Sequence, residues 1–374
     1  MKRLTAIVLA FWFLMSPIFC GAVSTSAKAA ILINADTLEV IYSQNAEEKL
    51  PMASTTKIMA GLLLCEYGNF DTEITVTAEM VAVEGSSMGL LAGDTVTLHD
   101  LLYGLMLSSG NDAANVIAYH LGGTVDGFVK QMNQKAKEIG LENTNFVTPS
   151  GLDADEHYTT AYDLAKLAAY ALKNEDFAAA VSSKSATLNY GNPPYRRTLT
   201  NHNKLLKLYD DAIGVKTGYT KKSGRCLVSA AERDGMKIIA VTLCDPDDWD
   251  DHIALLDYGF SALKKVEISP EEETYTVPVI SGVKDEIKIE IKPYSAYFLD
   301  DADLEARVNL PKFVYAPLKK GEKIGTVTYI KGGKVVAKSD ILASEDIAVA
   351  VTESNVKSKI TENIRSIFQG IWEK

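Results

Sequence analysis

The chain has 374 residues, of which 47% are hydrophobic, and its formal net charge at pH 7 is -11. This acidic balance argues against nucleic acid as the main partner, because a nucleic-acid interface needs clustered positive charge. The length and the apolar content exclude a disordered chain and predict about two domains with room for a core.

The N-terminus has the composition of a secretory signal peptide. Two basic residues precede a mostly apolar run over residues 4–20, and a segment of small residues ends at Ala29. We expect cleavage before Ala30, which assigns residues 1–29 to the signal peptide and places the mature protein outside the cytoplasmic membrane. A retained membrane helix is the alternative, although the run is short for a membrane span.

The first candidate motif stands at the start of a helix. Two short strands, residues 31–35 and 40–43, are predicted to form a hairpin, and a helical pattern begins near Ser54. Ser54 and Lys57 lie three residues apart, so their side chains share a helix face. A serine hydroxyl becomes a nucleophile when a base accepts its proton, and a lysine with a lowered pKa is such a base. An N-capping serine beside a solvated lysine is the alternative.

The second motif interrupts a helical pattern that runs from residue 100 to residue 121. There Ser109, Gly110 and Asn111 break the apolar period. A glycine among small polar residues at such a break predicts a loop, and this loop is expected to present its side chains into a cleft.

The third motif is Lys216-Thr217-Gly218, followed by Tyr219 and flanked by apolar residues. The motifs S-x-x-K, S-D-N and K-T-G occur together in class A β-lactamases and penicillin-binding proteins. The second motif of this chain departs from the β-lactamase form, because glycine replaces aspartate at its centre. Three motifs in the expected order argue against a chance match.

The elements around these motifs predict one α/β domain over residues 30–265. Strands at both ends enclose a mainly helical middle, so both ends are expected to complete one sheet. The late strands surround Asp234-Gly235, which is a strong hairpin signal. The predicted elements after the second motif are helices over 126–139 and 163–172, strands over 224–231 and 236–243, and a helix over 252–263.

Cysteine and histidine usage predicts no metal site and no cofactor. The mature chain keeps Cys65, Cys226 and Cys244, an odd number without a C-x-x-C motif. This pattern is neither a disulfide framework nor a zinc site, and the sequence leaves open whether Cys226 and Cys244 pair. The histidines carry no metal-binding motif, so they are expected to be structural or surface residues rather than bases. They include His157, His202 and His252.

The last part of the chain predicts a second domain and a terminal helix. From residue 274 to 351 apolar and polar residues alternate, which indicates a small β-rich domain over 266–352 without an evident catalytic group. Residues 353–374 have the spacing of an amphipathic helix, which would hold the protein reversibly at a bilayer surface or pack against its own β domain. Its apolar residues are Val356, Ile360, Ile364, Ile367, Phe368, Ile371 and Trp372.

With these motifs, the chain resembles the serine-type D-alanyl-D-alanine carboxypeptidases, which are low-molecular-mass penicillin-binding proteins. The likeness runs from Ala30 to Lys374 and includes the segments 85–88 and 151–153. It implies an α/β fold: a penicillin-recognising, β-lactamase-like domain with an antiparallel sheet flanked by helices and a helical lobe, then the β-rich domain and the terminal helix. It also implies removal of the terminal D-alanine from peptidoglycan pentapeptide stems, with β-lactams as covalent inhibitors.

The resemblance implies catalytic roles for the first two motifs. Ser54 is expected to be the acylated nucleophile and Lys57 its general base. Ser109 is expected to relay a proton toward the leaving amine, and the Asn111 amide to orient Lys57 and the substrate backbone.

The resemblance implies binding roles for the third motif. Lys216 and Thr217 are expected to bind the terminal carboxylate of the peptide, and Lys216 to help keep the first lysine neutral. Gly218 would let the substrate approach the strand closely. The backbone N–H groups of Ser54 and Tyr219 are expected to form the oxyanion hole.

The expected location is the outer face of the cytoplasmic membrane or the cell-wall space, with peripheral anchoring through the terminal helix. A secreted serine β-lactamase is one alternative, and Gly110, the extra domain and the lack of an E-x-x-L-N segment between residues 112 and 215 argue against it. A non-catalytic cell-wall binding protein is another, although every expected catalytic position holds a competent residue. Transpeptidase or endopeptidase activity on the same scaffold stays open.

Overall fold

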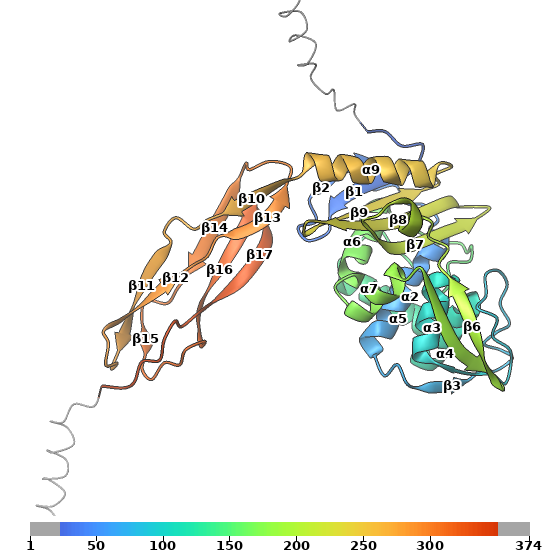
Figure 1. The fold of residues 1–374 in the computed structure, drawn as a ribbon, viewed down its shortest axis with the longest axis horizontal. Helices are drawn as coiled ribbons and strands as arrows, with labels where there is room; N and C mark the ends of the chain where they lie inside the picture. The colour runs from blue at the N-terminus through green and yellow to red at the C-terminus, as the bar shows by residue number, and fades with distance from the viewer. Residues whose placement is uncertain (1–22, 351–374) are drawn as a thin grey trace, which may run out of the picture. The chain divides into compact units, whose positions relative to one another are not determined.

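A computed structural model describes residues 23–350 (Figure 1). Most of the expected signal peptide and the expected helix over 353–374 lie outside the described residues. The chain divides into two compact units after Ala262. The expected boundary after residue 265 therefore falls inside strand β10 (Lys264–Ile268), which pairs within the second unit. No helix in the described part of the chain is long and apolar enough to cross a membrane.

The first unit is built on five antiparallel strands in the order β2-β1-β9-β8-β7. Both ends of the unit supply strands, as predicted, because β1 pairs with β9. The hairpin at Asp234 and Gly235 is confirmed, and both residues have the positive φ values, 52° and 78°, that its tight turn requires. The strands are β1 (Ala29–Asn34), β2 (Val40–Gln44), β7 (Ala212–Thr220), β8 (Gly224–Arg233) and β9 (Met236–Leu243).

Helices cover both faces of this sheet (Figure 1). Helix α9 (Asp248–Ala262) packs on one face, and α6 (Ala161–Ala171) and α7 (Glu175–Ser182) pack on the other. Residues of the central strand β9, such as Ile239 and Val241, are fully buried as a result. Each such side chain stabilises the fold by roughly 1.5 to 3 kcal/mol.

A helical lobe carries the first two motifs. The 3₁₀ helix η2 (Ala53–Thr56) leads directly into α2 (Lys57–Tyr67). The predicted break at the second motif is confirmed, because α3 (Leu98–Leu107) ends before it and α4 (Asn111–Gly122) begins at its last residue. The remaining helices are α5 (Val125–Glu138) and the short α8 (Leu205–Leu208).

The middle of the first unit is less purely helical than predicted. A four-stranded sheet in the order β3-β4-β5-β6 lies beside the lobe. The prediction missed the longer strands because β6 buries only Leu199 and so lacks apolar alternation. The strands are β3 (Glu73–Thr75), β4 (Thr95–Thr97), β5 (Ser185–Gly191) and β6 (Pro194–Thr200).

Residues just before the expected cleavage point belong to the described fold. The backbone N–H of Ser26 donates to Asp251 Oδ2 over 2.6 Å. The N–H of Lys28 donates to the last carbonyl of β9 over 3.1 Å, and Ala29 begins β1. A cut before Ala30 would remove all of these contacts.

The second unit is β-rich, as predicted, and consists of three small sheets: β10-β13, β12-β11-β15 and β14-β16-β17. Its core is apolar, with Ile287 and Phe298 fully buried. Gly332 and Gly333 form the turn between β16 and β17 with positive φ. The strands after β10 are β11 (Thr274–Ile280), β12 (Glu286–Glu290), β13 (Tyr294–Phe298), β14 (Leu304–Asn309), β15 (Val314–Tyr315), β16 (Lys323–Lys331) and β17 (Lys334–Leu342).

Candidate active site

The structure joins the two residues of the first motif. Ser54 lies in η2 and Lys57 is the first residue of α2, and their Oγ and Nζ atoms are 2.9 Å apart. The alternative of an N-capping serine is wrong, because Met52 occupies the N-cap of η2 and Thr56 that of α2. The alternative of a solvated lysine is also wrong, because Lys57 is 0% exposed.

Two further oxygen atoms fix the amine of Lys57. Nζ lies 2.7 Å from Asn111 Oδ1 and 2.6 Å from the backbone oxygen of Ser150. Both oxygens only accept hydrogen bonds, whereas a neutral amine offers two N–H donors and one lone pair. When the amine is neutral, these two oxygens take the two donors, and the lone pair is left to accept the Ser54 hydroxyl proton.

Burial favours that neutral form. Desolvation lowers the pKa of Lys57 well below its ordinary value, and the nearby charge of Lys216 lowers it further. The carboxylate of Asp112 opposes both effects by raising the pKa. Desolvation dominates, so the environment disfavours the ammonium form in the way that a general base requires.

The third motif places a second lysine in the interior. Lys216 in β7 is 1% exposed, and burial lowers its pKa to about 7. Its Nζ atom donates to the backbone oxygen of Thr217 over 3.0 Å. Burial therefore disfavours the ammonium form of this lysine, and an anion bound beside it would favour the charged form.

A cavity of about 460 Å³ opens in front of these buried groups. All three motifs contribute to its wall, so folding brings together the residues that the sequence singled out. Lys57, Asn111 and Lys216 are buried at 4% exposure or less. The motif residues that line the cavity are Ser54, Ser109, Thr217, Gly218 and Tyr219.

Glycine is required at position 218 for a steric reason. A Cβ atom there would lie 3.0 Å from the backbone nitrogen of Ser54 and 3.1 Å from the oxygen of Met52. Strand β7 thus passes very close to η2. A side chain at Gly218 would require β7 or η2 to shift, and so would alter the position of Ser54 against the strand.

The second motif is held by the loop that precedes it. Asn111 donates from its backbone N–H to the oxygen of Ser86 over 2.7 Å, and from Nδ2 to the oxygen of Glu84 over 2.6 Å. These bonds leave Asn111 Oδ1 directed at Lys57. Ser109 has a left-handed backbone with φ 56°, and it lines the cavity.

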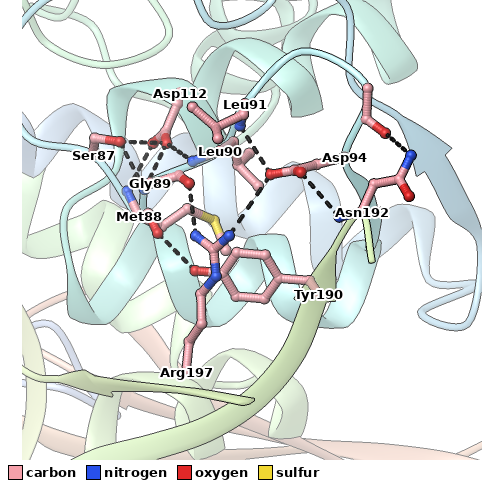
Figure 2. Close-up of polar contacts among 11 residues, drawn as sticks. Ser87, Met88, Gly89, Leu90, Leu91, Asp94, Asp112, Tyr190, Asn192 and Arg197 are labelled. Carbon is pink, nitrogen blue, oxygen red and sulfur yellow. Dashed lines mark hydrogen bonds and ion pairs between the residues drawn. The ribbon is translucent and has the colours of Figure 1, made fainter. Parts of the chain in front are cut away.

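Asp112 fastens this loop to α4 (Figure 2). Its buried carboxylate accepts hydrogen bonds from the Ser87 hydroxyl over 2.6 Å and from the N–H groups of Met88 and Leu90 over 3.0 Å. A carboxylate that accepts several such bonds is well satisfied without a cation. Because Asp112 follows Asn111 directly, the same bonds fix the start of α4.

Arg197 from β6 also contacts the loop that precedes the second motif (Figure 2). Its Nη1 donates to the oxygen of Gly89 over 2.6 Å, and its guanidinium lies against the rings of Tyr190 and Tyr195 at 4.3 and 4.1 Å. The Tyr190 hydroxyl donates to the oxygen of Met88 over 2.6 Å. The sheet that the sequence failed to predict therefore supports the second motif.

One wall of the cavity contains residues that no sequence motif predicted as part of the site. Arg225 Nη2 lies 2.5 Å from Asp248 Oδ1, and the guanidinium is 5.6 Å from the Trp249 ring centre. His202, which also lines the cavity, has a pKa lowered by burial and by Lys216. Arg225 and Asp248 carry no motif, and only the packing of β8 against the start of α9 brings them together, whereas His202 comes from the segment between β6 and α8.

His157 supports η2, which carries Ser54, and does not line the cavity. Its Nδ1 accepts the N–H of Val147 over 2.9 Å, so Nε2 carries the proton and donates to Thr56 Oγ1 over 2.8 Å. Thr56 in turn donates to the backbone oxygen of Ala53 over 2.8 Å. Burial lowers the pKa of His157 to about 4, so the ring is neutral at physiological pH.

The cysteines are all free in the described chain. Cys226 is buried, and burial raises the pKa of its thiol to about 11, whereas Cys244 is exposed. The question that the sequence left open is thus answered, because these two residues do not form a disulfide. Within residues 23–350, no group of three His, Cys, Asp or Glu side chains could hold a metal ion.

Two family models match the chain. The model of D-alanyl-D-alanine carboxypeptidase, peptidase family S11, matches residues 18–247, which is more than half of the chain. The chain belongs to this family. The C-terminal domain of penicillin-binding protein 5 matches residues 264–349. The expected catalytic-domain fold, the β-rich second domain and the serine-type carboxypeptidase class are confirmed, whereas the terminal helix stays a prediction; neither the β-lactamase nor the non-catalytic alternative is favoured.

Relatives and solved structures agree with this assignment. The D-alanyl-D-alanine carboxypeptidase DacF of Bacillus subtilis is 34% identical over 87% of this chain and 86% of its own length, and DacC of Escherichia coli is 31% identical over 90% of each. The crystal structure of penicillin-binding protein 5 from Haemophilus influenzae has a TM-score of 0.67 and 26% identity, covering 88% of this chain and 99% of its own. The Streptomyces K15 DD-transpeptidase has a TM-score of 0.61 and 34% identity, covering 64% and 98%.

Proposed function

We propose that Ser54 is the nucleophile of the carboxypeptidase and that neutral Lys57 is its general base. The observation that carries this proposal is the 2.9 Å approach of Ser54 Oγ to an amine whose two N–H donors have carbonyl-type partners. The lone pair of that amine has one direction left, toward the hydroxyl. Burial and the nearby Lys216 favour the neutral form.

The acylation step follows from these positions. Lys57 accepts the Ser54 proton as Oγ forms a bond to the carbonyl carbon of the penultimate D-alanine. The tetrahedral oxyanion is stabilised by the N–H groups of Ser54 and Tyr219, and a lost donor of this kind costs about 2.7 to 4 kcal/mol. The C–N bond then breaks, and the proton passes through Ser109 to the departing amine of the terminal D-alanine.

The second step returns the enzyme to its starting state. Water attacks the ester carbonyl, the bond to Ser54 Oγ breaks, and Oγ recovers a proton. A penicillin presents a strained amide to the same hydroxyl. Its acyl-enzyme keeps the rest of the antibiotic attached, so we expect release to be slow and the adduct to be observable.

Lys216 and Thr217 are the proposed partners of the terminal carboxylate. Lys216 is buried, which lowers its pKa to about 7, and a bound carboxylate favours its charged form. Thr217 lines the cavity and offers a hydroxyl beside that charge. The enzyme should therefore prefer a peptide with a free C-terminal carboxylate to one with a C-terminal amide, because the amide would leave the Lys216 ammonium without an anionic partner.

The decisive experiment is intact-mass spectrometry after treatment with benzylpenicillin. We expect one adduct, mapped by peptide analysis to the segment that contains Ser54. The Ser54→Ala variant should bear no adduct and should release no D-alanine from a peptide that ends in D-Ala-D-Ala. An adduct on another residue, or unchanged turnover by the variant, would refute the assignment.

A transpeptidase is the second candidate, because the Streptomyces K15 structure with this fold is described as a DD-transpeptidase. The two reactions share the acyl-enzyme and differ in whether water or an amine attacks it. Product analysis with a pentapeptide donor, with and without an amine acceptor, separates them. Release of tetrapeptide that the acceptor leaves unchanged identifies a carboxypeptidase.

The proposed location is the outer face of the cytoplasmic membrane, with residues 353–374 as a peripheral anchor. Family members act on cell-wall peptidoglycan, which is consistent with a site outside the cytoplasm. The contacts of Ser26 and Lys28 favour removal of the signal peptide upstream of Ser26 rather than before Ala30. The N-terminal mass of the exported protein tests this point.

A further inference from the structure

Strand β15 lies at one end of the second unit (Figure 1). Five exposed apolar residues belong to this strand, to the end of β11 that pairs with it, and to the segments next to these strands. Ile280 pairs with Tyr315 between β11 and β15, and the ring of Phe313 packs edge-on against that of Tyr315 with 5.4 Å between centroids. Gly282, next to Val283, forms a bridge with Val349. We name this group the apolar tip; its members and their exposed fractions are Ile280 42%, Val283 62%, Phe313 45%, Tyr315 65% and Val349 42%.

The described chain ends at the apolar tip. Val349 belongs to the tip, and the N–H of Ala350 donates to the oxygen of Ser281 over 2.8 Å. The segment 353–374, with its large apolar residues at three- and four-residue spacing, begins three residues later. Connectivity therefore brings the segment proposed as the membrane anchor to the end of this unit that carries the apolar tip.

We propose that the apolar tip is a second membrane contact, which inserts into the headgroup region of the bilayer beside the anchor. This inference rests on the proposed membrane association of residues 353–374. Aromatic side chains such as Phe313 and Tyr315 suit this interface, because an apolar ring and a polar hydroxyl match its two sides. The exposed Lys312 adds a positive charge next to the rings, where anionic lipid attracts it.

A bilayer explains the tip better than the anchor folding back onto it. A helix over 353–374 would be roughly 33 Å long, whereas the tip consists of the ends of a few strands. Packed against the tip, such a helix would leave much of its apolar face in water. A membrane surface covers both at once, and two contacts hold a protein at a bilayer more firmly than one.

The test is flotation of the purified mature chain with vesicles of phosphatidylethanolamine and phosphatidylglycerol. The double variant Phe313→Ser/Tyr315→Ser should partition about tenfold less strongly than the wild type. The matched control Val335→Ser/Leu342→Ser removes two apolar side chains of similar exposure, 63% and 49%, from β17 of the same unit. It should partition like the wild type.

Each result has one interpretation. Hydrogen exchange should show vesicles protecting the tip strands, and protection already complete without vesicles would mean that the anchor covers the tip. Unchanged partitioning of the tip variant, while Ile367→Ser/Phe368→Ser partitions weakly, would overturn the tip contact and leave the anchor standing. A wild type that never floats would refute both. Release of D-alanine from a soluble peptide by every variant keeps these outcomes separate from the catalytic proposal.

Discussion

The two units of the chain bury different kinds of side chain. Among the described residues, every buried charged or amide-bearing side chain lies in the first unit, and the second unit closes its core with apolar groups. Burying a polar group is unfavourable unless hydrogen bonds replace those it makes with water. The first unit accepts this penalty at Lys57 and Lys216, where the lowered pKa values are the property that the proposed reaction uses.

The contrast separates activity from stability. In the second unit a core residue contributes packing and nothing else, so its loss should lower stability alone. In the first unit a buried lysine of the proposed site serves the proposed reaction and opposes folding, so its replacement by an apolar side chain should lower activity and leave stability equal or higher.

Truncation in the second unit should have the largest effect on stability. Phe298 is fully buried in that core, so Phe298→Ala should lower the free energy of unfolding of the unit by about 3 to 5 kcal/mol. Acylation by penicillin should persist, because the proposed catalytic residues all lie in the first unit. Calorimetry together with adduct formation checks this. A parallel loss of acylation would show that the two units do not act independently.

Replacement of the buried ammonium should separate the two properties in the opposite sense. Lys216→Met removes the proposed carboxylate partner, so kcat/KM should fall by roughly 100-fold. It also removes a buried amine whose hydrogen bond goes to Thr217, so the free energy of unfolding should rise by about 1 kcal/mol. Loss of its charge should raise the pKa of Lys57 and move the acidic limb of the pH profile upward.

The outcome for Lys216 has a clear control. Replacing the exposed Lys221, four residues beyond Thr217, with methionine changes the same net charge on the surface. That variant should leave kcat/KM and the pH profile unchanged. If Lys216→Met were destabilised instead, the buried amine would contribute to folding and the contrast between the units would be weaker than stated.

How far the sequence anticipated the site depends on how local each feature is. Ser54 and Lys57 meet because they are three residues apart at a helix start, and Asp234-Gly235 turns because of its own backbone preference. Local features of this kind are readable from sequence. Arg225 contacts Asp248 because β8 and α9 pack together, and the sequence of neither segment predicts that contact.

The contacts that support the second motif could not be predicted from the sequence for the same reason. Asp112 reads as an ordinary acidic residue in the first turn of α4, yet it accepts bonds from a loop more than twenty residues earlier. Arg197 belongs to β6, a mostly exposed strand that lacks the apolar alternation by which a strand is predicted. Candidate reactive residues are easier to predict from sequence than the residues that position them, because the positioning contacts join distant segments.

Loss of the Asp112 carboxylate should weaken the reaction by loosening that loop. In the wild type both carboxylate oxygens of Asp112 accept N–H groups of the loop. In Asp112→Asn an amide NH₂ group, which cannot accept them, replaces one of these oxygens, so kcat/KM should fall roughly tenfold. Removing a charge that raises the pKa of Lys57 should also shift the acidic limb of the profile to lower pH. Asp100→Asn, which disturbs only the cap of α3, should leave that limb in place.

The smallest expected effect concerns acid stability. The pKa of His157 is about 4 in the folded chain and 6.5 ordinarily, so the unfolded chain takes up the proton first as pH falls. The stabilisation from the neutral ring is complete above pH 6.5 and is lost toward pH 4, with a loss of about 1.4 kcal/mol at pH 5.5. His157→Gln should flatten the dependence of unfolding free energy on pH in this window, measured by urea titration. Part of the slope should remain, because burial lowers the pKa of His252 to about 3 as well. An unchanged slope in His157→Gln would mean that burial does not hold His157 neutral in the folded chain.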